Sequence, residues 1–134
     1  MNLVPASMTA LRQAVKHLQQ GGVVATGIDR PIPEPDIRPL FFNHPAALPT
    51  HHIHLAIRAR VPIMLMAVNL QADGKYHIRT SEPFEMEPHP NRDTQTLQNA
   101  ERVLKIAEGF IRNAPQQWSM SLPVWPELLD KIPD

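Results

Sequence analysis

Asp29 and Arg30 are the two side chains best placed for chemistry in this sequence, because they directly follow an apolar run. Residues 23–28 have the short β-branched composition of a strand that is buried on both faces. In open α/β sheets, ligands bind beyond the carboxyl ends of the strands, which is where this pair would lie. A guanidinium holds phosphate or carboxylate in a planar fork, and an aspartate accepts from hydroxyls. Position alone favours a turn residue beside a surface cation; the alternative is that Asp29 and Arg30 bind substrate.

Three histidines within four residues, His51, His52 and His54, suggest a metal site. Residues 49–59 are expected to form a helix, on which neighbouring positions diverge by about 100°. Ligand pairs on a helix are spaced i, i+3 or i+4, and no cysteine or acid nearby completes a ligand set. The pattern favours a solvated helix start over a metal site, and we expect neither a metal nor another cofactor.

His77 and Glu82 reproduce the His-x4-acid spacing of a known acyl-transfer motif. That motif works when a helix or tight turn brings the acid to the imidazole, so that the acid orients the base. Here His77 lies in an alternating, strand-like stretch and Glu82 precedes a proline. About 16 Å of extended chain would separate the two side chains. We interpret the spacing as coincidental and leave the catalytic residues unassigned.

Trp118 and Trp125 lie in an aromatic, proline-rich segment over residues 115–134. One interpretation is an amphipathic patch near a membrane or a lipid tail. The other is a C-terminal arm whose tryptophans fasten it to the core, and the pattern by itself favours this second interpretation.

The composition is that of one neutral domain, which we place over residues 1–134. The 13 basic and 13 acidic residues balance, so nothing indicates a nucleic-acid partner. There is no cysteine, which excludes disulfides, thiolate zinc sites and cysteine nucleophiles. No apolar run reaches the ~20 residues that a membrane-spanning helix needs, and the first residues lack a signal-peptide pattern. The expected location is the cytoplasm.

Apolar spacing predicts three helices. Ser7 is a plausible N-cap for the first helix, Gly21 suits the left-handed position after it, and Thr50 is a plausible cap for the second. Pro115 should stop the third, in which apolar residues recur every three or four positions. The predicted helices are 8–20, 49–59 and 94–114.

Four strands are expected, and they complete an α/β fold in which a mixed β-sheet is flanked by helices. The run at 62–70 is the clearest core strand, and Asp73-Gly74 predicts a reverse turn from it into an alternating strand. These two strands should form an antiparallel hairpin. The predicted strands are 23–28, 40–42, 62–70 and 75–80.

Taken in order, the segments resemble the C-terminal half of the bacterial lipid A biosynthesis acyltransferases, within the lysophospholipid acyltransferase superfamily. "LQQGGVVATGIDRP" is similar to the family's strand that ends in an acidic loop, and "LFFNHPAALPTHHIHLAIRARVPI" to its next strand and helix. "DGKYHIRTSEPFE" resembles the following hairpin, and "NAERVLKIAEGFIRNAPQQW" the closing helix with its Gln-Trp ending. The resemblance covers about residues 11–125.

The resemblance implies a transferase that moves a fatty acyl chain from acyl-CoA or an acyl-carrier protein to a hydroxyl of a glycolipid or lysophospholipid. It implies peripheral attachment at the inner membrane face. In such enzymes a histidine, oriented by an acid five positions later, deprotonates the acceptor hydroxyl. Arg30 would then clamp the phosphate or sugar of the acceptor, and Asp29 would accept from it. This role requires residues 23–28 to be a strand that ends at the lip of a cleft.

The sequence departs from the family pattern at several points. The His-x4-acid element belongs upstream of the resembling region, so we expect this chain to lack it. Gly27 replaces a second acid of the loop, and His51 replaces a helix glycine. After the Gln-Trp ending, Met120, Leu122, Pro123 and Val124 replace the family's tryptophan, histidine and paired arginines, which removes a basic surface.

A second hypothesis is a binding or oligomerisation module that is not catalytic. A partial sheet exposes an edge that must be covered. The partner in that case is a second copy of the chain or a complementing N-terminal half of the fold.

Overall fold

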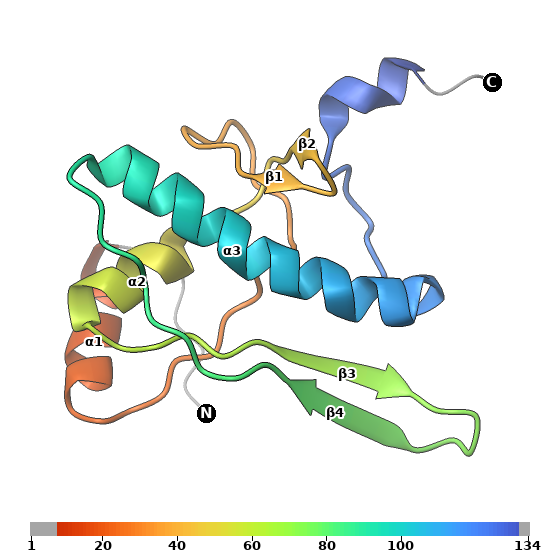
Figure 1. The fold of residues 1–134 in the computed structure, drawn as a ribbon, viewed down its shortest axis with the longest axis horizontal. Helices are drawn as coiled ribbons and strands as arrows, with labels where there is room; N and C mark the ends of the chain where they lie inside the picture. Colours follow the sequence, from red (N-terminus) through yellow and green to blue (C-terminus); the bar gives the residue numbers. More distant parts are fainter. Residues whose placement is uncertain (1–7, 132–134) are drawn as a thin grey trace.

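The computed structural model describes residues 8–131 and combines helices with two small antiparallel sheets (Figure 1). This is the mixed helix and strand content that the sequence predicts. Ser7, the proposed N-cap, lies outside the described residues. The elements are α1 (Met8–Gln19), β1 (Leu40–Phe41), β2 (His44–Pro45), α2 (His51–Ala59), β3 (Met66–Leu70), β4 (Tyr76–Thr80), α3 (Arg92–Asn113) and the 3₁₀ helices η1 (Pro115–Gln117) and η2 (Pro126–Lys131).

Helix α3 is the longest element and crosses the molecule, with the two sheets on opposite sides of it (Figure 1). It begins two residues earlier than predicted because the side chain of Asn91 accepts from the backbone N–H of Thr94 at 2.8 Å. It ends at Asn113, just before Pro115, as predicted. Its apolar face forms the centre of the core, with Ala100, Val103, Leu104 and Ala107 buried.

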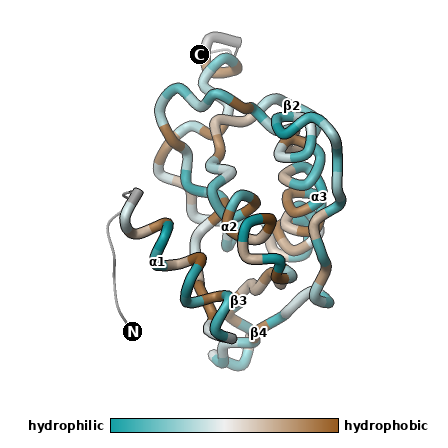
Figure 2. The backbone as a smooth tube through the Cα atoms, turned by 90° about the vertical axis from the view of Figure 1, so that its left-hand side faces the viewer, coloured by the Kyte–Doolittle hydropathy of each residue, from teal (hydrophilic) through white to brown (hydrophobic). Residues whose placement is uncertain are grey.

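The two shorter helices confirm the prediction at one end of the molecule. Gly21 has φ +84°, the left-handed conformation expected after α1. Thr50 occupies the N-cap position of α2 but makes no capping hydrogen bond with its side chain. Helix α2 lies between α1 and α3 (Figure 2), so it is buried on more than one side, with Ile53 fully inaccessible.

Strands β1 and β2 form a hairpin that is bound to α3. The two turn residues, Phe42 and Asn43, have φ +49° and +64°, as a tight hairpin with two positive-φ positions requires. Such a conformation is ordinary for asparagine and rare for phenylalanine. Phe42 holds it because its backbone N–H donates to Glu108 Oε1 at 2.7 Å, while the N–H of Leu40 donates to Glu101 Oε1 at 3.1 Å. The sequence predicts β1 but does not reveal β2.

Glu108 is a buried carboxylate that the sequence analysis did not identify. Its side chain is only 3% exposed, and it accepts from Lys105 and from Arg112 at 3.0 Å each, in addition to Phe42. Burial raises the pKa of Glu108, but these hydrogen bonds outweigh burial and the net pKa is lowered. Lys105 and Arg112, three positions before and four after, were the only signal in the sequence.

The predicted hairpin between residues 62–70 and 75–80 is confirmed, with Val68 opposite Ile78 and Leu70 opposite Tyr76. The prediction of one mixed sheet is wrong: the described residues form two separate two-stranded antiparallel sheets. The region 62–70 is also not a core strand. Strand β3 begins only at Met66, and Ile63 makes an isolated bridge to Phe84 instead.

One face of the β3–β4 hairpin is apolar and exposed, and we call it the hairpin face. Along β3 and the chain before it, alternate side chains are about half exposed, and those of β4 directly opposite are more so. The hairpin face consists of Met64 (54% exposed), Met66 (63%), Val68 (52%), Leu70 (45%), Tyr76 (72%) and Ile78 (65%).

Residues 23–28 are not a strand, so this prediction is wrong. The segment makes no bridge to either sheet within the described residues, and Val23 is 85% exposed. A short β-branched run becomes a strand only where a neighbouring strand supplies ladder hydrogen bonds, and none lies beside this one. The segment is attached through Ile28, which packs against the core, and through a hydrogen bond between Thr26 and His51.

Candidate functional site

Asp29 lies where the extended segment 23–28 meets the C-terminal arm. Its carboxylate Oδ2 accepts a hydrogen bond from the indole Nε1 of Trp118 at 3.0 Å, and the residue is partly buried. The bond joins positions 89 residues apart, so it holds the loop against the arm. Because the indole binds Oδ2, the second oxygen, Oδ1, is left to accept from another donor.

Arg30 differs from Asp29 in having no contact with the described residues that fixes it. It is exposed, and within the described residues its guanidinium makes no hydrogen bond or ion pair. The two hollows described below are lined by other residues. The pair therefore divides into an anchored acid and a free cation, and the strand-end argument for its binding role is withdrawn along with the strand.

The tryptophans pin the arm to the core, as the favoured interpretation predicts. Trp125 stacks on Phe41 with ring centroids 5.6 Å apart, and its Nε1 donates to the Phe41 carbonyl at 3.1 Å. Trp118 meets the edge of the same ring at 5.7 Å. Both rings are partly buried, and Val124 between them is 3% exposed.

The three histidines of α2 take three different environments rather than one site. His51 is exposed, and its Nε2 shares a hydrogen bond of 2.9 Å with Thr26 Oγ1. His54 is partly buried and lines a hollow of about 220 Å³ together with Glu34 and Asp36. In the part of the chain that the structure describes, no three histidine or acidic side chains converge to hold a metal ion.

His52 is the unexpected member of this group. It is 6% exposed, and neither ring nitrogen has a hydrogen-bond partner within the described residues. Burial, with smaller contributions from His51 and His54, lowers the pKa of His52 to about 4. The prediction of a solvated helix start is therefore wrong for His52, because this side of α2 faces the protein interior.

His77 and Glu82 do not form a catalytic pair in the structure. His77 lies within the extended strand β4 and Glu82 lies beyond the end of that strand. Both are exposed, and no hydrogen bond joins them among the described contacts.

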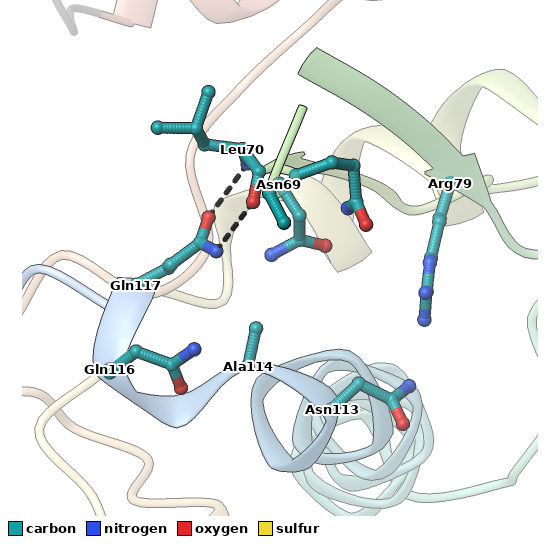
Figure 3. Close-up of a pocket in the computed structure, with 9 residues that line it drawn as sticks. Asn69, Leu70, Arg79, Asn113, Ala114, Gln116 and Gln117 are labelled. Carbon is teal, nitrogen blue, oxygen red and sulfur yellow. Dashed lines mark hydrogen bonds between the residues drawn. The ribbon is translucent and has the colours of Figure 1, made fainter. Parts of the chain in front are cut away.

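A hollow that the sequence analysis did not identify lies between the β3–β4 hairpin and the C-terminal end of α3, and we call it the polar hollow (Figure 3). Its volume is about 190 Å³. The polar residues that line it are Asn69, Gln71, Arg79, Asn113, Gln116 and Gln117. They come from two distant stretches of the chain, the β3–β4 hairpin and the end of α3 with η1, and show no common motif, so only the fold brings them together.

Gln117 closes one side of this hollow by replacing a missing strand. Its carboxamide accepts from the Leu70 N–H at 2.8 Å and donates to the Leu70 carbonyl at 2.9 Å (Figure 3). Both backbone groups of Leu70 would otherwise be unpaired at the outer edge of β3. The glutamine before Trp118 therefore joins the hairpin to α3.

Comparison with known families decides the assignment of the chain. Residues 1–126 match the family model described as bacterial lipid A biosynthesis acyltransferase. The chain belongs to this family. A search among curated proteins gave no match.

Family membership confirms the resemblance that four sequence motifs carry, and it associates the chain with acyl transfer in lipid biosynthesis. Gln117 and Trp118 are the two residues of the Gln-Trp ending that contributes to this resemblance, and each makes a long-range hydrogen bond in the structure. One joins α3 to the hairpin and the other anchors Asp29. Among the described helices, none has both the length and the apolar character that crossing a bilayer requires.

Proposed function

We propose that the chain is a domain of an enzyme that transfers a fatty acyl group from a thioester donor to a hydroxyl of a glycolipid or lysophospholipid at the inner membrane face. The observation that carries the proposal is the family match over residues 1–126. In this reaction the acceptor oxygen forms an ester bond with the acyl carbon, the C–S bond breaks, and the thiol leaves with a proton. We assign no residue of this chain to the removal of the hydroxyl proton.

In this proposal Arg30 and Asp29 bind the acceptor, although the strand end on which the sequence argument for this role depended is absent. The support that remains is the state of the two side chains. The exposed, unpaired guanidinium of Arg30 supports a contact with phosphate, since a guanidinium binds phosphate through two parallel hydrogen bonds. The Trp118 indole holds Asp29 in one orientation and leaves Oδ1 for an acceptor hydroxyl. The donor is acyl-CoA or an acyl-carrier protein.

The test measures acyl transfer from dodecanoyl-CoA or hexadecanoyl-CoA to a lysophospholipid, with the chain alone and with added protein that supplies a His-x4-acid segment. Arg30→Gln should raise the KM for the acceptor about tenfold or more, because a charge-assisted hydrogen bond is worth roughly 1.5–3 kcal/mol. Arg58→Gln, an exposed arginine on α2, is the matched control and should leave KM unchanged.

Two outcomes would count against this proposal. One is an absence of turnover in both arrangements, together with an absence of acceptor binding by calorimetry. The other is turnover that His77→Ala abolishes, which would restore the His77–Glu82 pair as catalytic and displace Asp29 and Arg30 from the centre of the site.

A second candidate function is an interaction module that pairs with another copy of the chain, and the free edge of β4 favours it. Hydrogen bonds from Gln71 N–H to Lys75 and from Ser81 N–H to Leu65 fix which residues of β4 face β3. By alternation, the N–H and C=O groups of Tyr76, Ile78 and Thr80 point outward. All five residues of β4 are exposed.

Two copies of β4 can pair antiparallel about a two-fold axis at Ile78. Tyr76 then lies opposite Thr80 of the second copy, and Arg79 opposite His77, so no two arginines and no two carboxylates face each other. Ile78→Pro removes an outward N–H without breaking the β3–β4 ladder and should abolish self-association in sedimentation. A strict monomer of the unmodified chain at high concentration would exclude this candidate.

A further inference from the structure

Carboxamides are the commonest side chains around the polar hollow and make up five of its nine lining residues; the other four are Leu70, Ala72, Arg79 and Ala114. Asn69 lies on the hairpin side of the hollow, while Asn113 and Gln116 lie at the end of α3 and in η1 (Figure 3). Gln71, which follows β3, also lines it. A carboxamide both donates and accepts hydrogen bonds, so these walls offer both kinds of group at close range.

The backbone at the rim of the hollow is held in place before any ligand arrives. Gln117 binds both backbone groups of Leu70, which ties the hairpin to η1 at the rim of the hollow. The 3₁₀ turn itself is fixed by bonds from the Gln117 N–H to Ala114 and from the Trp118 N–H to Pro115, at 3.0 and 3.1 Å. A ligand therefore meets a rim whose backbone is already ordered, which lowers the cost of binding there.

The groups that line the hollow are free. Within the described residues, the side chains of Asn69, Gln71, Asn113 and Gln116 form no hydrogen bond with the protein, and Arg79 has no carboxylate partner. In Figure 3 the side chain of Arg79 extends from β4 toward Asn113. Five unpaired polar side chains around one small volume are a binding surface.

The charge of the hollow favours a neutral ligand. Arg79 is the one ionised side chain among the described lining residues. The C-terminal end of α3 lies at the same wall and carries the partial negative charge of unpaired helix carbonyls. These charges offset each other, so neither an anion nor a cation is strongly preferred.

We propose that the polar hollow binds the ring of an uncharged, hydroxyl-rich molecule, that is, a neutral sugar. Each sugar hydroxyl donates and accepts, which complements a carboxamide, and Arg79 donates to ring or hydroxyl oxygens. The volume of about 190 Å³ lies below the ~300 Å³ at which pockets for drug-sized ligands begin, which limits the occupant to a single ring. This binding does not depend on acyl transfer, because it needs neither a thioester donor nor Asp29 and Arg30.

The test is a titration of the ¹⁵N-labelled chain with methyl α-D-glucopyranoside, followed through the side-chain amide signals in heteronuclear NMR spectra. We expect saturable shifts of the Asn69, Asn113 and Gln116 amides with a Kd on the order of 1 mM, as for a ligand with few atoms. The double substitution Asn113→Ala and Gln116→Ala should weaken binding about tenfold or more, since it removes two hydrogen-bonding groups. Both residues are exposed, so the fold should tolerate the change.

Gln98→Ala, an exposed glutamine on α3 outside the hollow, is the matched control and should bind as the unmodified chain does. A parallel titration uses inorganic phosphate. Shifts of the same amides with phosphate but not with the glucoside would overturn the proposal in favour of an anion site. An absence of shifts with the glucoside, or shifts confined to other residues, would also overturn it, whatever the acyl-transfer assay shows.

Discussion

The two hairpins of this protein illustrate opposite ways of treating a short sheet. The β1–β2 hairpin is held by helix α3, where Glu101 and Glu108 accept the N–H groups of Leu40 and Phe42, and Phe41 beside them is fully inaccessible. The β3–β4 hairpin is joined to the end of the same helix through Gln117, and six apolar side chains of the hairpin face stay exposed. Phe41 is buried and the hairpin face is exposed because burial follows what an element packs against.

The two hairpins also differ in their surroundings, because one lies among tightly packed contacts and the other among unpaired surfaces. We call the part of the molecule around the β1–β2 hairpin the tight side. It contains the turn at Phe42, the buried carboxylate of Glu108 and the tryptophans that anchor the arm. We call the part around the β3–β4 hairpin the open side. It contains the polar hollow, the free edge of β4 and the hairpin face. Substitutions on the first side should therefore change the free energy of unfolding more than substitutions on the second side.

The largest expected effect is at Glu108. Glu108→Ala removes the acceptor that holds Phe42 at positive φ and leaves Lys105 and Arg112 without their partner. We expect a loss of about 3 kcal/mol in the free energy of unfolding, measured by urea denaturation. Glu101→Ala is the matched control, since it removes a single bond to Leu40 and should cost about 1 kcal/mol. Equal losses for the two substitutions would contradict a special role for Glu108.

The next effect is a loss of stability in acid through His52. The folded protein keeps the pKa of His52 at about 4, below the ordinary value of 6.5, so the unfolded chain binds a proton that the folded protein does not. The contribution of the neutral His52 to the free energy of unfolding is complete above pH 6.5 and declines as the pH falls toward 4. Between pH 7 and pH 5 the free energy of unfolding should drop by about 2 kcal/mol from this residue alone.

Denaturation curves at both pH values test this effect. In His52→Leu the decline should be smaller by that amount, because leucine fills the site without titrating. If the two proteins lose stability in parallel, the imidazole is not the group responsible.

A smaller effect is expected where the open side is joined to the helix. Gln117→Ala leaves the N–H and C=O of Leu70 unpaired by protein, although water can reach them. The expected loss is about 1 kcal/mol, with faster amide hydrogen exchange in β3 and β4 than in α3. Gln116→Ala, one residue earlier, is the control and should leave both quantities unchanged.

The smallest effect should come from the hairpin face. Val68→Thr, at a position 52% exposed, is expected to change the free energy of unfolding by less than about 0.5 kcal/mol. Val103→Thr, at a position with no exposure, places a hydroxyl in the core and should cost about 2 kcal/mol. If sedimentation shows that the protein self-associates and Val68→Thr then lowers the free energy of unfolding strongly, a second copy covers this face.

Local patterns in the sequence determined the helices, the turn at Gly74, the stop before Pro115 and the family motifs, because each depends on residues close together in the chain. The prediction of a strand at 23–28 was wrong because β propensity is a local property, whereas a strand forms only beside a neighbouring strand. Contacts between segments far apart in the sequence decided the features that the sequence did not predict. The Trp118 bond to Asp29, the burial of His52, the Glu108 contact with Phe42 and the polar hollow each join segments that only the folded chain brings together.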